Sequence, residues 1–114
     1  MRSDRLYLQD IVEAADAIAG FIGGSDRDSF SRSDLLISAV QMKLTIIGEA
    51  ASRIKDQLRD KHPEIAWKKV AAYRNFAVHA YFAVSPNVVW DTATIHAPAI
   101  KTNALAILAN EFPA

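Results

Sequence analysis

The chain of 114 residues contains no cysteine. A disulfide framework, a thiolate nucleophile and a cysteine-ligated zinc site are therefore excluded, and nothing points to an oxidising compartment. The formal charge is zero, because 13 Lys and Arg residues balance 13 Asp and Glu residues. Such a chain lacks the broad basic surface of non-specific DNA-binding proteins, so any contact with a nucleic acid must be local.

Long apolar runs are also absent. The longest runs, such as residues 78–84 with His79 inside it, are far too short to cross a bilayer. Acidic residues at positions 10, 13 and 16 stand where a signal peptide would need an unbroken apolar core. We therefore expect a cytoplasmic protein that does not contact a membrane. Its length, its 51% of hydrophobic residues and its 23% of charged residues predict a single globular domain over residues 1–114.

Apolar residues recur at helical spacing over much of the chain. Residues 4–22 carry them every three or four positions, and the glycine pair at positions 23 and 24 ends this predicted helix. The polar residues 25–33 predict a surface loop. Residues 34–60 lack proline and predict a second, longer helix with a wide apolar arc. So wide an arc indicates a helix that is central in its own bundle and is also covered by a second subunit.

Proline marks the boundaries of the remaining helices. Pro63 lies in a predicted break, and residues 67–78 predict a third, shorter helix. Pro86 lies in the expected first turn of a fourth helix, where its missing amide costs nothing. Pro98 lies inside that helix and should kink it or divide it. No strand-like alternation competes with this pattern, which predicts an all-α, up-and-down bundle of four or five helices.

One short segment carries most of the chemically useful side chains. Arg74, Asn75, His79 and Tyr81 place a guanidinium, an amide, an imidazole and a phenol close together in sequence. Arginine binds two phosphate oxygens through its planar fork, histidine exchanges a proton near neutral pH, and tyrosine donates or accepts a hydrogen bond. Each of these groups has a use at a phosphodiester.

The spacing restricts how these side chains can cooperate. On a regular α-helix Asn75 and His79 share a face, whereas Arg74 and His79 point about 140° apart. Arg74 and His79 therefore converge only under one of two conditions. Either the helix ends near His79 and the chain turns, or an isologous dimer brings the same segment in twice.

An acidic residue on the apolar second helix is a further candidate. Glu49 needs a cation or water in that setting, and either Arg74 or Arg53 could supply the cation, Arg53 from the same helix face. A purely structural hypothesis pairs Arg74 with Glu49 and uses His79 to cap a helix end. The neighbouring Gly48 could instead mark a position where two helices cross closely.

The three histidines do not predict a metal site. They stand at positions 62, 79 and 96, without the close spacing of a metal-binding motif. We expect neither a metal nor a cofactor.

At this point the chain resembles the HEPN superfamily, and within it the HepT-like toxins. Their hallmark is an arginine, four to six residues, a histidine and, in HepT, a tyrosine two residues further along. Here these residues are Arg74, His79 and Tyr81. The similarity spans residues 46–98 and includes a second-helix signature at 46–51 and flanking segments at 63–67 and 89–92.

The resemblance implies a homodimeric, metal-independent endoribonuclease that acts as the toxin of a toxin–antitoxin pair. Its partner would be a MntA-like minimal nucleotidyltransferase, which silences the toxin by binding it or by transferring AMP from ATP onto the tyrosine that matches Tyr81. RNA supplies its own nucleophile, the 2′-hydroxyl, so the site needs only a base, an acid and a cation. Arg74 and His79 from two copies would supply them, with Asn75, Tyr81 and Glu49 in supporting roles.

A second hypothesis is a catalytically inactive helical partner of a nucleotidyltransferase. The formal charge of zero and the wide apolar arc favour it. So do Phe76 and Ala80, which stand where many relatives carry polar residues. A dimer that binds the nucleotidyltransferase but cuts no RNA would identify this function.

Overall fold

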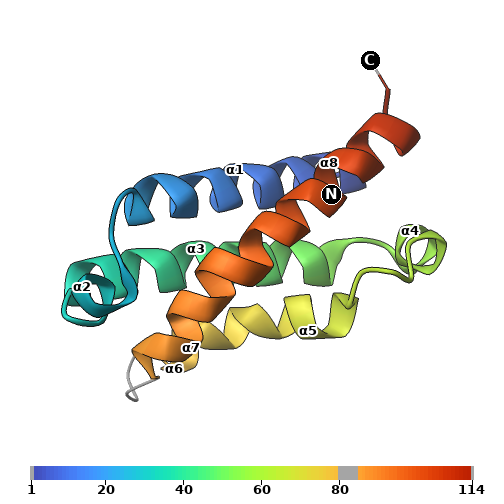
Figure 1. Ribbon diagram of the computed structural model, residues 1–114. Helices are drawn as coiled ribbons and strands as arrows, with labels where there is room; N and C mark the ends of the chain where they lie inside the picture. Colours follow the sequence, from blue (N-terminus) through green and yellow to red (C-terminus); the bar gives the residue numbers. More distant parts are fainter. Residues whose placement is uncertain (1, 80–84, 114) are drawn as a thin grey trace.

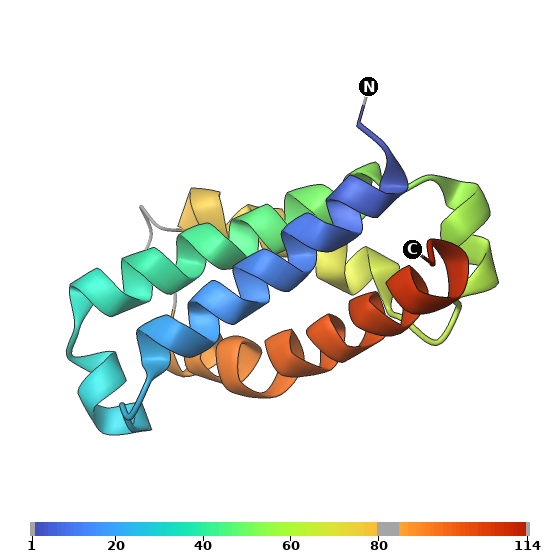
Figure 2. The same cartoon turned by 90° about the horizontal axis from the view of Figure 1, so that it is seen from above.

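The computed structural model describes residues 2–79 and 85–113, and at residues 78 and 79 it describes the backbone alone. Within these residues all regular structure is helical. Four segments run up and down, and Figures 1 and 2 show them packed side by side. They are α1 (Asp4–Ile22), α3 (Asp34–Arg53), the segment that begins with α5 (Trp67–Ala71), and the segment that ends with α8 (Ala97–Glu111). The predicted all-α, up-and-down bundle is confirmed.

The predicted loop over residues 25–33 is wrong, because a short helix, α2 (Arg27–Ser31), forms there. Asp26 and Ser29 make a capping box in which the Ser29 backbone amide donates to Asp26 Oδ1 at 2.8 Å. This hydrogen bond lowers the pKa of the Asp26 carboxyl. Phe30 is fully buried and its ring centroid lies 5.3 Å from that of Trp90. The cap, the buried ring and an ion pair between Arg27 and Asp91 at 2.9 Å together hold this polar stretch as a helix.

The single helix predicted for residues 34–60 is also wrong. The helix ends at Arg53, Ile54 is extended, and a separate helix, α4 (Asp56–Lys61), follows. Two contacts hold the break: Arg59 Nε donates to the Ile54 carbonyl at 2.9 Å, and the Lys55 amide donates to Asp4 Oδ1 at 3.2 Å. The first contact is local, whereas the second joins the break to α1, so local propensity alone does not decide where the helix ends.

The third predicted helix is present but is not uniform. After α5 come a 3₁₀ turn, η1 (Ala72–Asn75), and α6 (Phe76–His79). The fourth begins as predicted, with Ser85 capping α7 (Pro86–Asp91). A π-helical turn, η2 (Thr92–His96), then precedes α8, whose first turn contains Pro98. The kink expected near Pro98 is confirmed and the helical segment is not divided, because proline cannot donate to the preceding turn and its ring crowds the carbonyl there.

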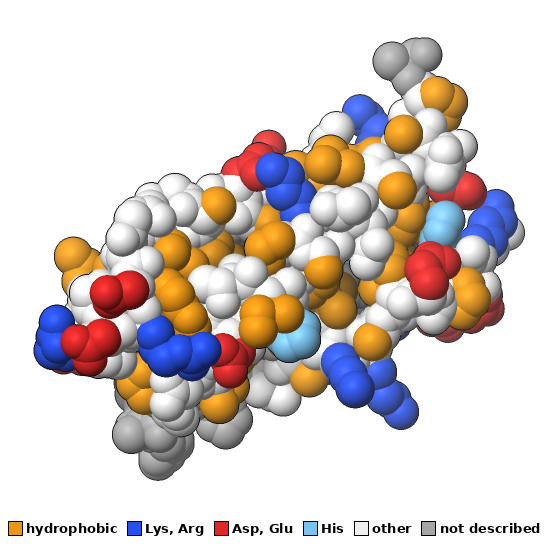
Figure 3. All heavy atoms as spheres, viewed as in Figure 1, with side chains coloured by type: hydrophobic (Ala, Val, Ile, Leu, Met, Phe, Trp, Pro, Cys, Tyr) orange, Lys and Arg blue, Asp and Glu red, His pale blue; other side chains and the backbone are white. Residues whose placement is uncertain are grey.

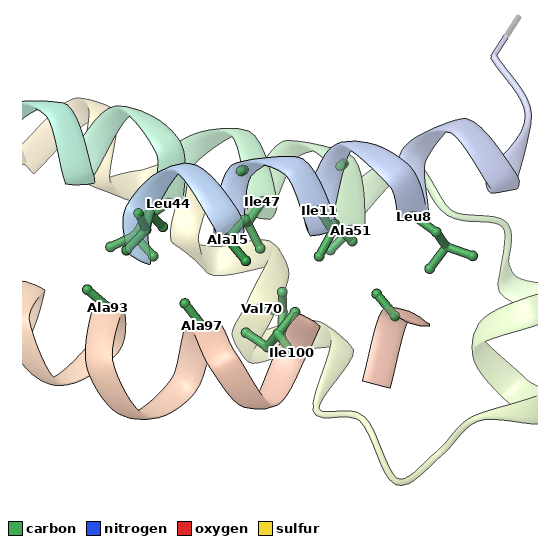
Figure 4. Close-up of a cluster of buried hydrophobic side chains, with 14 of the residues drawn as sticks. Leu8, Ile11, Ala15, Leu44, Ile47, Ala51, Val70, Ala93, Ala97 and Ile100 are labelled. Carbon is green, nitrogen blue, oxygen red and sulfur yellow. The ribbon is translucent and has the colours of Figure 1, made fainter. Parts of the chain in front are cut away.

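Helix α3 is central to the core. It packs against α1 on one side and against α5, η1 and α6 on the other. Figure 4 shows Leu44, Ile47 and Ala51 of α3 in the same cluster as side chains of α1, α5 and α8. Leu44 and Ile47 are fully buried, and each such side chain contributes about 1.5–3 kcal/mol to folding.

In the part of the chain that is described, α3 is also the one helix long and apolar enough to cross a membrane by length and composition. Seven of its residues are buried inside the bundle. The core helix of a bundle meets the same criterion, so this feature alone does not indicate a membrane span.

Candidate active site

Arg74 lies at the edge of an open groove of about 580 Å³. The groove is bounded by the C-terminal end of α3, by α4, and by the segment formed by α5 and η1. Arg74 is exposed, and its guanidinium has no ion-pair or hydrogen-bond partner among the described residues. An exposed guanidinium of this kind is available to bind a phosphate group.

A close helix crossing fixes the backbone of Arg74. Where η1 passes α3, a methyl group at Gly48 would lie 2.3 Å from the backbone nitrogen of Arg74 and 2.8 Å from the carbonyl carbon of Tyr73. No side chain fits at these distances. Gly48 therefore lies at a close helix crossing, one of the roles that the sequence suggested for it. It allows the backbone of Arg74 to lie directly against the central helix.

Two aromatic residues on either side of Arg74 anchor the same segment. Phe76 is only 9% exposed, and its ring centroid lies 5.9 Å from that of Tyr73 in an edge-to-face arrangement. Burial raises the pKa of the half-buried Tyr73 hydroxyl. Arg74 and Asn75 between them are exposed. The apolar residue at position 76 thus serves as a core anchor, while its polar neighbours face solvent.

Glu49 does not pair with Arg74. Its carboxylate accepts a hydrogen bond from Arg53 Nε at 2.9 Å, four residues along α3. The pairing of Arg74 with Glu49 that the structural hypothesis required is wrong, because the nearer cation on the same helix face, Arg53, takes the carboxylate. Both side chains are about half exposed, and such surface pairs contribute roughly 1 kcal/mol or less.

The remaining motif residues are described only in part. His79 is placed by its backbone as the last residue of α6, while Ala80 and Tyr81 lie outside the described residues. The 3₁₀ turn puts positions 74 and 79 about 160° apart around the helix axis, somewhat further than on a regular α-helix. Within one copy the two positions therefore lie on different sides of the segment.

Neither of the other two histidines lines the groove beside Arg74. His62 is largely buried between Glu64, at 3.5 Å, and Glu111, at 3.9 Å, where it joins the loop before α5 to the end of α8. His96 is exposed and lines a second hollow of about 380 Å³ between α5 and α8.

Two basic residues of the groove were not among the site residues predicted from the sequence. Arg59 of α4 and Lys68 of α5 line the groove together with Arg74. The only sequence signal is the spacing of Lys68, Ala71 and Arg74, which are three residues apart and all line the groove. Arg59 could not be found in this way, since its position depends on the break between α3 and α4.

Comparison with known proteins shows the family to which this chain belongs. The profile of the family described as "Ribonuclease HepT-like" matches residues 11–107, which include the bundle core and the Arg74 segment. The chain belongs to this family, within the HEPN superfamily of all-α proteins.

Two relatives illustrate the similarity. "Probable ribonuclease HepT" of Thermococcus cleftensis is 37% identical over 100 residues, which cover 88% of this chain and 91% of the relative. "Putative RNase TTE0752" of Caldanaerobacter subterraneus subsp. tengcongensis is 29% identical over 111 residues, which cover 97% and 99% of the two chains. No solved structure matches the chain.

Proposed function

We propose that this protein is a metal-independent endoribonuclease that acts as a toxin and uses Arg74 and His79. The observation that carries the proposal is the exposed guanidinium of Arg74 at the edge of a groove of about 580 Å³, unpaired among the described residues. Membership of a ribonuclease family supports the choice of RNA as substrate. We also propose that the protein is cytoplasmic, where RNA substrates are available to it.

The proposed reaction is an internal transfer at phosphorus. The 2′-oxygen of RNA attacks the adjacent phosphorus and loses its proton, and the bond from phosphorus to the 5′-oxygen breaks as that oxygen gains a proton. The products carry a 2′,3′-cyclic phosphate and a 5′-hydroxyl. A histidine can move both protons, and an arginine stabilises the extra charge on the phosphoryl oxygens. Asn75 and Tyr81 would orient the imidazole or contact the phosphate, and Glu49 would support the site from α3.

A second copy of the chain completes the proposed site. On the outer face of α3, Leu35, Met42 and Ile46 are 81%, 60% and 36% exposed and form one stripe. Ser52, which lines the Arg74 groove, lies about 80° from Met42 around the same helix. Pairing of two copies through this stripe would bury apolar surface and place both grooves beside the interface.

The purified protein is expected to be a dimer that cleaves RNA in the presence of EDTA and leaves cyclic phosphate ends. Met42→Glu places a charge in the proposed interface, so we expect a monomer with cleavage reduced at least tenfold. Leu105→Glu is the matched control, because Leu105 is an exposed apolar residue on α8. Light scattering and analysis of labelled RNA measure both properties.

Two results would count against this function. An active Met42→Glu monomer would exclude the composite site, since one copy would then suffice. A dimer that binds a nucleotidyltransferase and cuts no RNA would favour the inactive-partner hypothesis instead.

We further propose that a MntA-like nucleotidyltransferase is the antitoxin and that it adds AMP to Tyr81. The support is the match of Arg74, His79 and Tyr81 to the HepT motif. An adenylyl group would bring bulk and negative charge close to the proposed phosphate site and repel RNA. Incubation with a MntA-like nucleotidyltransferase and ATP is expected to add the mass of one or more AMP groups. Tyr81→Phe should abolish the gain, and an unchanged mass of the wild-type protein would contradict the proposal.

A further inference from the structure

The groove beside Arg74 extends well beyond that one side chain. Its volume of about 580 Å³ is within the range of ligand-binding sites. The reaction itself requires the binding of only one phosphate, so the groove has room for more of the substrate. Cations enter it from three elements: Arg59 from α4, Lys68 from α5 and Arg74 from η1. Basic side chains that follow a groove are typical of sites that bind a nucleic-acid backbone.

The 3₁₀ turn aligns two of these cations. In a regular α-helix, positions 68 and 74 would lie about 120° apart around the axis. Over η1 the chain turns three residues per turn, so Arg74 lies above Ala71, and Lys68 is only about 60° away. Lys68, Ala71 and Arg74 accordingly all line the groove. Figure 3 shows basic side chains projecting from the edge of the molecule formed by α5.

The three basic side chains of the groove differ in whether they already have a partner. Asp56 pairs with Arg59 at 3.2 Å, and Arg59 Nε donates to the Ile54 carbonyl at 2.9 Å, so this guanidinium is held in place. Lys68, like Arg74, has no ion-pair partner in the described part of the chain, and it is exposed. The groove also contains one further carboxylate, Asp60. Lys68 is therefore the cation that remains available for a second phosphate.

We propose that this groove binds the RNA strand next to the cleaved position, with Lys68 contacting a flanking phosphate. Trp67, whose Nε1 donates to the His62 carbonyl at 2.9 Å, gives the groove a fixed aromatic residue of the kind on which bases stack. This inference rests on the proposed ribonuclease function. It assigns the sequence-independent part of RNA binding to the contact made by Lys68.

The test compares neighbouring lysines on α5. Lys69 lines the other hollow, between α5 and α8, so it is a matched control for Lys68. A fluorescent ten-nucleotide RNA with 2′-deoxy sugars throughout its centre cannot be cleaved, and its binding is followed by fluorescence anisotropy at several salt concentrations. Lys68→Ala is expected to weaken binding about fivefold and to reduce the salt dependence by roughly one phosphate contact. Lys68→Arg should retain the affinity, and Lys69→Ala should change it less than twofold.

The outcomes separate this inference from the proposed function. Equal effects of Lys68→Ala and Lys69→Ala, or no effect of either, would overturn the groove assignment even if the wild-type protein cleaves RNA. A wild-type protein that binds the uncleavable RNA through Lys68 but cuts no natural RNA would contradict the ribonuclease and leave the groove assignment supported.

Discussion

Replacement of Arg74 by alanine is expected to lower RNA cleavage at least about 100-fold, and His79→Ala should have an effect of similar size. Loss of a group that stabilises transition-state charge costs about 10²–10³ in rate, and loss of a general acid or base costs about 10²–10⁴. Arg74 is exposed and unpaired among the described residues, so Arg74→Ala should leave the thermal midpoint almost unchanged. Single-turnover cleavage of labelled RNA, beside a thermal melt, measures both quantities.

Arg32→Ala is the control for loss of an exposed arginine. Arg32 pairs only with Asp28 of the short helix α2 among the described residues, far from the groove in sequence and in fold. Its removal should leave cleavage within twofold of wild type. Full activity of Arg74→Ala or of His79→Ala would show that the residue has no catalytic role.

Mixing the two inactive variants tests whether the site is shared. If Arg74 and His79 act from two copies, a heterodimer of Arg74→Ala and His79→Ala still contains one intact residue of each kind. Some activity should therefore return when the two proteins are unfolded together and refolded. A mixture no more active than its separate components would indicate that each copy must supply both residues.

The sequence predicts those features of the fold that depend on local pattern. The apolar spacing and the glycine pair define α1, and Pro86 and Pro98 mark the start and the kink of the last helical segment. Arg74 and Asn75 are both exposed on η1, and Arg74 lines the groove, while their roles at a site stay a prediction. These helix boundaries can be predicted without knowing which residues pack against each helix.

Features that depend on contacts distant in sequence could not be predicted. The break after Arg53 is stabilised by Asp4, which is 51 residues from its partner Lys55, and without this break α4 would not form one wall of the groove. The short helix α2 depends on the burial of Phe30 against Trp90. In both cases a helix boundary follows from tertiary packing that the local pattern does not contain.

Among substitutions of the four glycines by alanine, Gly48→Ala is expected to have the largest effect on stability. The new Cβ would lie 2.3 Å from the Arg74 backbone nitrogen, and backbone atoms cannot rotate away as a flexible side chain can. Overpacking of this kind costs about 1–3 kcal/mol or more, which lowers the thermal midpoint by roughly 5–15 °C for a domain of this size. Because η1 must move away from α3, cleavage should also fall at least about tenfold at a temperature where the variant is still folded.

Gly20→Ala is expected to have the opposite effect on stability. No atom lies within 4 Å of a Cβ built at Gly20, an exposed position inside α1, so alanine there should stabilise the helix by about 0.5–1 kcal/mol. Circular dichroism melts of both variants, with cleavage measured well below each midpoint, separate displacement of Arg74 from general unfolding. Gly48→Ala with wild-type stability and activity would show that the crossing is loose. The position of Arg74 would then have to be set by Tyr73 and Phe76, whose rings would be the next side chains to truncate.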